Sequence, residues 1–159
     1  MSGDKSTPYR FLYRLVSWIV KSSLKLLFGL KAKGLKNIPE DGAFIFASNH
    51  RSLIDPPIIG SLCPREVYFA AKKELFEIAI IGNIIRYFNS VPVRRTGYDR
   101  GMLKLLGKAL DGGYGITIFP EGTRSRDGKL GRPKPGVGIL SKIHNAVVVP
   151  VHISGSADL

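Results

Sequence analysis

The first residues with a chemical character worth following are Asn49-His50 and, five positions after the histidine, Asp55. A neutral imidazole can accept a proton, and a carboxylate can fix its tautomer and stabilise the imidazolium that forms. The two side chains meet only if His50 lies in a turn and a helix begins near Asp55, which Pro56 favours as a first-turn residue. Taken alone, the pair permits two interpretations: a general base with its orienting carboxylate, or a turn histidine followed by a helix-capping aspartate.

A second polar segment, Phe119 to Arg126, follows another apolar run. Gly122 allows close backbone approach, Thr123 supplies a hydroxyl, and Arg124 supplies a planar cation. Glu121 cannot itself bind an anion, so we assign it to orienting Arg124 or to holding a substrate hydroxyl. The alternative is a polar loop with a Glu–Arg pair, although Asp127-Gly128 already supplies a turn there.

Two more segments end apolar runs in the same way. Arg94 and Arg95 follow Val91-Pro92-Val93 and could hold a phosphate through bidentate hydrogen bonds, or form a solvated basic turn. His152 follows Val149-Pro150-Val151 and could line a site, although a core or edge histidine is the more ordinary interpretation.

Short apolar runs alternate with helical patterns along the chain, which predicts an α/β layered sandwich with a largely parallel mixed sheet flanked by helices. The carboxyl ends of such strands meet at one edge, where α/β proteins place their sites. The expected strands are Ala43–Ser48, Val67–Ala70, Val91–Val93, Ile116–Phe119 and Ala146–Ile153. The expected helices are Pro8 to about Leu30, Pro56–Leu62, Asp99–Leu110 and Gly136–His144.

The N-terminal helix is predicted to be amphipathic, with its cations within an arc of roughly 60° and aromatic and aliphatic residues on the remaining surface. This pattern is typical of a helix lying in a bilayer interface, although packing on its own domain is the alternative. No uncharged stretch reaches the roughly 18 to 20 residues that span a bilayer, and no cleavable signal peptide is visible. The cations are Arg10, Arg14, Lys21 and Lys25.

Charge is the unusual feature of the composition, with 24 basic against 12 acidic residues and a net charge of +12. Such an excess indicates polyanionic partners: nucleic acid, an anionic bilayer or phosphorylated substrates. One cysteine, Cys63, excludes an internal disulfide, and no residues have metal-ligand spacing. We expect an interfacial helix at 1–33 and a catalytic domain at 34–159 that is truncated at its C-terminus, since it stops just after a strand.

In their order along the chain, Asn-His-x4-Asp, Val-Pro-Val-x-Arg, Phe-Pro-Glu-Gly-Thr-Arg-Ser and Val-Pro-Val resemble the glycerolipid acyltransferase family. This family includes the 1-acylglycerol-3-phosphate (lysophosphatidic acid) acyltransferases. The resemblance implies that His50 and Asp55 are catalytic. It also implies that Arg95 and the Glu121-Gly122-Thr123-Arg124 loop bind the acceptor. Arg94 departs from the acidic or polar residue that many members carry.

The activity implied is transfer of a fatty acyl chain from acyl-CoA or acyl carrier protein to the free hydroxyl of 1-acylglycerol-3-phosphate, giving phosphatidic acid for phospholipid biosynthesis. We expect direct transfer without an acyl-enzyme, a metal or a cofactor. The expected location is the cytoplasmic face of the cell membrane, as a peripheral or monotopic protein on an anionic surface. Alternatives are another lysophospholipid or glycerol-3-phosphate as acceptor, or a non-catalytic basic binder of membranes or nucleic acid. We expect no nucleic-acid partner, because the aromatics cluster in the N-terminal helix and buried strands rather than along a basic groove.

Overall fold

A computed structural model describes residues 7–79, 82, 85, 89–93, 100–125 and 127–158 of the 159-residue chain. The predicted strands and helices are confirmed to within a few residues, and short 3₁₀ turns connect some of them. The strands are β1 (Phe44–Ser48), β2 (Val67–Lys72), β3 (Ser90–Val93), β4 (Gly115–Ile118) and β5 (Val147–Val151). The helices are α1 (Thr7–Phe28), α2 (Asp55–Leu62), α4 (Arg100–Asp111) and α5 (Gly136–His144), with 3₁₀ turns η1 (Leu35–Asn37), η2 (Lys73–Glu77) and η3 (Ser156–Asp158).

The strands form one sheet in the order β3-β2-β4-β1-β5, and every pair between the described strands is parallel. The prediction of an α/β sandwich with a largely parallel sheet is therefore confirmed. Strand β1 lies between β4 and β5, with Phe44 opposite Gly115 on one side and Val147 on the other. Because the strands are parallel, the loops that leave β1, β4 and β5 emerge next to one another.

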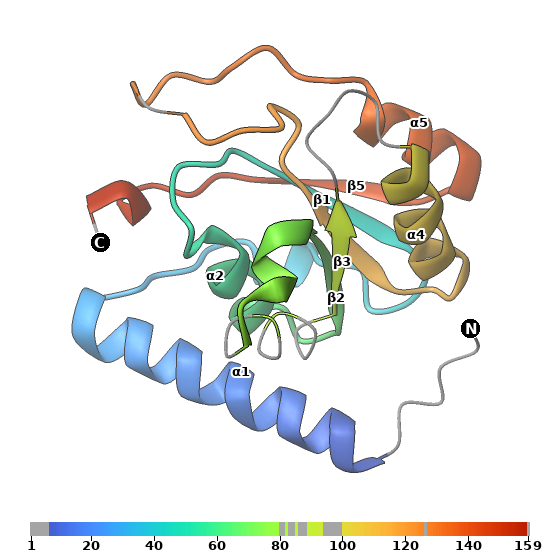
Figure 1. Ribbon diagram of the computed structural model, residues 1–159. Coiled ribbons are helices and arrows are strands. Elements are labelled where there is room, and N and C mark those ends of the chain that lie inside the picture. The colour runs from blue at the N-terminus through green and yellow to red at the C-terminus, as the bar shows by residue number, and fades with distance from the viewer. Residues whose placement is uncertain are drawn as a thin grey trace.

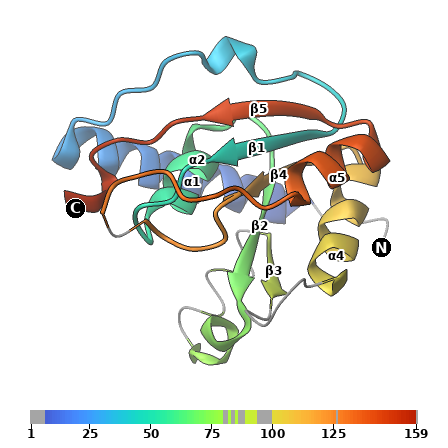
Figure 2. The same ribbon diagram turned by 90° about the horizontal axis from the view of Figure 1, so that it is seen from above.

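Helices cover both faces of the sheet (Figures 1 and 2). Successive residues of β1 point to opposite faces, as in any strand. Phe44 and Phe46 join the apolar core on the α2 face, with Ile58 and Ile59. Ile45 joins the core on the other face, which α4 and α5 supply with their apolar residues.

Helix α1 packs against α2, on the outside of that layer (Figure 1). Tyr13 and Ser17 of α1 are buried, so the side of the helix that faces the rest of the chain carries small or polar side chains. Most of the bulky apolar side chains of α1 are exposed: Phe11, Leu12, Leu15, Trp18, Ile19, Leu26, Leu27 and Phe28. Among the described helices, α1 included, we find none with the length and hydropathy to cross a bilayer.

Candidate active site

His50 and Asp55 meet at the carboxyl end of β1. His50 lies in the loop after the strand, and α2 begins at Asp55, as the spacing predicted. The distance from His50 Nδ1 to Asp55 Oδ2 is 2.8 Å, and the side chain of Asp55 is completely buried while that of His50 is 17% exposed. Since an ionised carboxylate only accepts hydrogen bonds, Nδ1 carries the proton, and Nε2 is left with a lone pair that can accept one.

The Asp55 carboxylate is held by the loop that precedes it. The backbone N–H groups of Arg51 and Ser52 donate to Oδ2 over 2.7 and 2.8 Å. Burial by itself raises the pKa of Asp55, but the hydrogen bonds from His50, Ser52, Ser156 and Arg51 more than offset it, so the pKa lies below its ordinary value. Asp55 is therefore ionised at neutral pH and can stabilise a protonated His50.

The capping interpretation of Asp55 is not what the geometry shows. Ile54 occupies the N-cap position of α2, and no side-chain cap hydrogen bond is made there. The Asp55 carboxylate instead points back to the loop and its histidine.

Phe119, at the end of β4, supports the other side of the histidine. Its ring stacks on the His50 ring with 4.0 Å between centroids and 21° between planes. The imidazole is thus held on one face by Phe119 and at Nδ1 by Asp55, which fixes the direction of Nε2. The sequence did not reveal this role for Phe119, which stood out only as the last apolar residue before the polar loop.

The loop after β4 is bonded to the loop that carries His50. The backbone N–H of Ser125 donates to the carbonyl of His50 over 2.8 Å. The carboxylate of Glu121 accepts from the N–H of Gly131 at 2.6 Å and, more weakly, from the N–H of His50 at 3.4 Å. Glu121 therefore shapes the backbone on both sides of the site. Among the described residues it forms no ion pair with Arg124, the partner that we assigned to it.

The exposed surface of this loop is cationic. Gly122 has a left-handed φ of 72°, and a Cβ there would lie 2.8 Å from Nζ of Lys134. The N–H of Lys134 donates to the carbonyl of Pro120 over 2.9 Å, which holds this residue beside the loop. Thr123 and Arg124 are exposed nearby on the same loop. Two cations and a hydroxyl can together hold an anion. We did not predict a role for Lys134 from the sequence, although the basic segment that contains it, Gly-Arg-Pro-Lys, was a visible signal.

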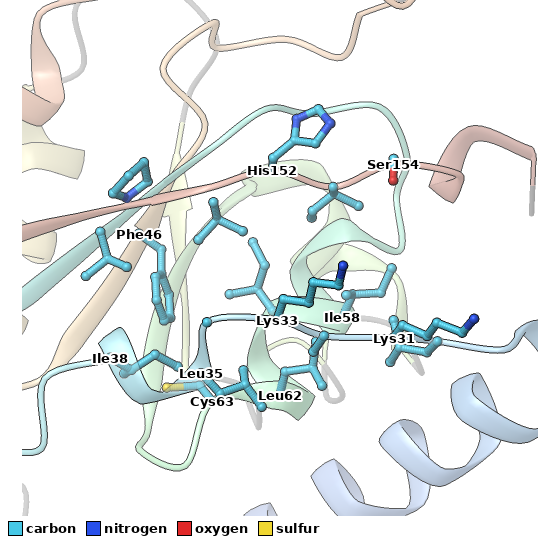
Figure 3. A pocket seen from close by; sticks show the side chains of 18 of the residues that line it. Lys31, Lys33, Leu35, Ile38, Phe46, Ile58, Leu62, Cys63, His152 and Ser154 are labelled. Atoms are coloured by element: carbon cyan, nitrogen blue, oxygen red, sulfur yellow. The ribbon is translucent and has the colours of Figure 1, made fainter.

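Two other predicted positions, Arg95 and His152, are not among the residues that surround His50 in the described part of the chain. Arg95 lies outside the described residues, although β3 ends at Val93, just before it. His152 is exposed and borders a cavity beside β5, but its ring points away from the apolar side chains on the other side of β5 (Figure 3). Within the described ranges, no group of three or more His, Cys, Asp or Glu side chains converges as a metal site.

A cavity of about 720 Å³ opens on the α2 side of β1 and β5. Its lining is mostly apolar and includes Phe46, Ile58 and Leu62, with Lys31 and Lys33 on the segment that follows α1 (Figure 3). The cavity reaches Ile153 to Ser156 at the carboxyl end of β5, the same edge of the sheet as His50.

The sequence profile of the acyltransferase family matches residues 29–154. The chain belongs to the acyltransferase family. A 1-acyl-sn-glycerol-3-phosphate acyltransferase of Bacillus subtilis (strain 168) is 31% identical over 149 residues, which cover 92% of this chain and 73% of that protein. A chloroplastic 1-acyl-sn-glycerol-3-phosphate acyltransferase of Arabidopsis thaliana is 31% identical over 157 residues, covering 96% of this chain and 44% of its own length.

The acyltransferase fold is also found in a solved structure. The crystal structure of the 1-acyl-sn-glycerophosphate (LPA) acyltransferase PlsC from Thermotoga maritima superposes with a TM-score of 0.77 at 30% identity, over 97% of this chain and 62% of that one. The family resemblance seen in the four motifs is thus confirmed. This chain spans between 44% and 73% of the length of these three acyltransferases.

Proposed function

We propose that this acyltransferase moves a fatty acyl chain from acyl-CoA or acyl carrier protein to the free hydroxyl of 1-acylglycerol-3-phosphate and so makes phosphatidic acid. One observation carries the proposal. His50 contacts the buried carboxylate of Asp55 through Nδ1, and it lies beside an exposed cationic loop whose Ser125 N–H donates to the carbonyl of His50. This arrangement joins a base for a hydroxyl to a binding site for a phosphate. The names of the relatives support the choice of acceptor.

In the proposed reaction, Nε2 of His50 takes the proton of the acceptor hydroxyl while its oxygen attacks the thioester carbonyl carbon. The new C–O bond replaces the C–S bond, and the proton passes to the departing thiolate. General-base help of this kind is worth about 10² to 10⁴ in rate. Asp55 keeps the imidazole in the required tautomer and stabilises its positive charge. The reaction uses no cofactor beyond the thioester donor.

The acceptor phosphate is proposed to bind at the loop after β4. Arg124 supplies a planar donor pair, and Lys134 adds a point charge beside Gly122, where the absent side chain leaves the backbone accessible. Thr123 adds a hydroxyl. Arg95 is retained as a further phosphate ligand on the strength of the motif. Fixing the phosphate places the acceptor hydroxyl near His50.

The cavity beside α2 is proposed to take an acyl chain. Its apolar lining suits hydrocarbon, and it begins at the Ile153–Ser156 segment beside Asp55. Lys31 and Lys33 lie along it, where they can meet the anionic groups of a lipid or of a thioester donor (Figure 3).

Helix α1 is proposed to bind an anionic membrane surface, so that the protein works peripherally on the cytoplasmic face. Its exposed aromatic and aliphatic residues provide the apolar contact, and Arg14, Lys21 and Lys25 provide the charge. Co-sedimentation should be strong with vesicles containing phosphatidylglycerol and weak with neutral phosphatidylcholine vesicles. Preferential binding to nucleic acid in a gel-shift assay would favour the non-catalytic alternative instead.

An acceptor panel tests the proposed activity. Purified chain is supplied with labelled acyl-CoA or acyl carrier protein and with lysophosphatidic acid, lysophosphatidylcholine or glycerol-3-phosphate, and the lipid products are separated. Labelled phosphatidic acid is the expected main product. A faster reaction with either other acceptor would replace the proposed substrate, and no transfer to any acceptor would refute the proposed activity for this chain.

A further inference from the structure

The two oxygens of the Asp55 carboxylate are held very differently. Oδ2 accepts hydrogen bonds from the His50 ring and from two backbone amides. Oδ1 is buried and makes no hydrogen bond that meets ordinary geometric limits with any described residue. A buried, ionised oxygen without a donor is unfavourable, so such an atom calls for an explanation.

The hydroxyl of Ser156 is a donor available to this carboxylate. It is the first residue of η3, it is only 2% exposed, and its hydroxyl likewise lacks a well-formed hydrogen bond within the described part of the chain. The hydroxyl also lies close enough to the carboxyl to help lower the pKa of Asp55. The buried hydroxyl of Ser156 thus lacks an acceptor, the buried Oδ1 of Asp55 lacks a donor, and the two side chains interact.

The backbone just before Ser156 is held by contacts with Asn49, which precedes His50, and with α2, which follows it. The side chain of Asn49 donates to the carbonyl of Ile153 over 2.8 Å and accepts from its N–H over 2.7 Å. This double contact continues the β1–β5 pairing beyond the ends of both strands. Ile153 is itself buried in the core cluster that contains Ile58 and Ile59 of α2.

A left-handed turn at Gly155, with φ of 77°, then leads the chain into η3. Both views place this end of the chain beside the loop that leads into α2 (Figures 1 and 2).

We propose that Ser156 is a positioning residue that donates a hydrogen bond to Oδ1 of Asp55 and thereby fixes the plane in which Oδ2 meets His50. The inference rests on the proposed function, since it assigns a third member to the same His–Asp unit. Ser156 borders the cavity proposed for the acyl chain, but its buried hydroxyl does not touch substrate in this proposal. Its effect passes through Asp55 to the direction of Nε2, and so it belongs to the chemical step and not to acceptor binding.

The test compares Ser156→Ala with Ser156→Thr, which keeps the hydroxyl, and with Ser141→Ala, which removes a hydroxyl of α5 that donates to the carbonyl of Ala146, before β5 begins. Loss of one hydrogen bond to a charged group predicts about a tenfold fall in kcat for Ser156→Ala with unchanged KM for both substrates. Ser156→Thr should recover at least half of the lost kcat, and Ser141→Ala should match wild type. Thermal unfolding of each variant shows whether it is folded.

Three results would overturn the proposal: a folded Ser156→Ala variant with kcat within twofold of wild type, a loss that appears only in KM, or a folded Ser156→Thr variant as impaired as Ser156→Ala. If Ser156→Ala does not fold, Ser156→Cys decides, because it keeps the size with a weaker donor. A reduced kcat in the folded Ser156→Cys variant supports the hydrogen bond, and a full kcat refutes it.

Failure of the proposed function is recognised separately, as absence of transfer by wild type in the same assay. In that case the role of Ser156 is tested without substrate, by the low-field proton NMR signal of His50 Nδ1–H. The signal is assigned by its loss in His50→Ala. It should shift in Ser156→Ala and stay in place in Ser141→Ala. An unchanged signal in Ser156→Ala would exclude the positioning role.

Discussion

Two histidines of this chain contact an aspartate through Nδ1: His50 lies 2.8 Å from Asp55, and His144 lies 2.6 Å from Asp111. The contacts are almost the same, but their surroundings are not. Asp55 is completely buried, whereas the side chain of Asp111 is 64% exposed. The first pair lies at the carboxyl edge of the sheet, and the second joins the last residues of α5 and α4, just before β5 and β4 begin.

The free nitrogen of each ring also faces a different environment. A Cβ at Gly107 would lie 2.6 Å from Nε2 of His144, so that nitrogen faces the backbone of α4. His50 instead stacks on Phe119, beside the exposed cationic loop. The comparison teaches that a His–Asp contact does not by itself define a catalytic base. The buried carboxylate, the strand end and the neighbouring cationic loop distinguish the first pair from the second.

The largest expected effect comes from His50→Ala, set against His144→Ala. Removing the base should lower the rate of phosphatidic acid formation about 10²- to 10⁴-fold, because the acceptor hydroxyl keeps its proton. His144→Ala should stay within about threefold, since His144 and Asp111 lie before β5 and β4 begin, away from the carboxyl edge of the sheet that carries His50. Co-sedimentation of His50→Ala with anionic vesicles should be unchanged. Near-full activity in His50→Ala would make the two pairs equivalent and end the catalytic assignment.

Asp55→Asn and Asp111→Asn compare the two carboxylates in the same way. Asp55→Asn should lower kcat about 10²-fold or more, because an amide neither fixes the tautomer as well nor stabilises the imidazolium. The KM for lysophosphatidic acid should hardly change. Asp111→Asn should leave both constants near wild type. Equal losses in the two variants would mean that burial of the carboxylate has no catalytic consequence.

A smaller effect is expected at the cationic loop, where Arg124→Ala removes a proposed phosphate ligand. The KM for lysophosphatidic acid should rise about tenfold, the worth of one charge-assisted hydrogen bond, with little change in kcat. Lys108→Ala, a cation on α4 near the second pair, is the control and should leave KM unaltered. A normal KM in Arg124→Ala would remove Arg124 from this role.

The smallest effect concerns stability against pH. The pKa of Asp55 lies below its ordinary value of 3.8 in the folded chain, so its ionisation stabilises the fold fully above pH 3.8. This stabilisation is lost as the pH falls through the lowered pKa. The difference in unfolding free energy between wild type and Asp55→Asn should therefore shrink from pH 5 towards pH 2 in urea titrations. An equal decline for Asp111→Asn would show that the effect is not specific to the buried carboxylate.

Local sequence patterns predicted much of the fold and the contact between His50 and Asp55. Apolar runs and the caps around them located the helices and strands, because these signals lie within a few residues of each other. The five-residue offset between His50 and Asp55, followed directly by Pro56, correctly predicted the turn at His50 and the start of α2. Lysines, arginines and exposed apolar residues of α1 indicated an interfacial helix, and the exposure of Trp18 and Phe28 agrees with that interpretation.

The rest of the site depends on contacts between distant parts of the chain. Asn49 and Ile153 are 104 residues apart, and only the position of β1 between β4 and β5 brings them together. The same strand order places Phe119 on His50 and Ser156 near Asp55. Glu121 illustrates the reverse case, since its neighbour Arg124 suggested an ion pair while the fold directs the carboxylate to two backbone amides. No local spacing encodes these contacts.

The central claim is that His50, held by Asp55, activates the acceptor for direct attack on the thioester. Thiol release from acyl-CoA, followed with and without lysophosphatidic acid, measures this most directly. The account predicts release only when the acceptor is present, one thiol for each phosphatidic acid, with no mass added to the protein. Thiol release without acceptor, together with an acyl adduct on the protein, would show a covalent route and contradict it.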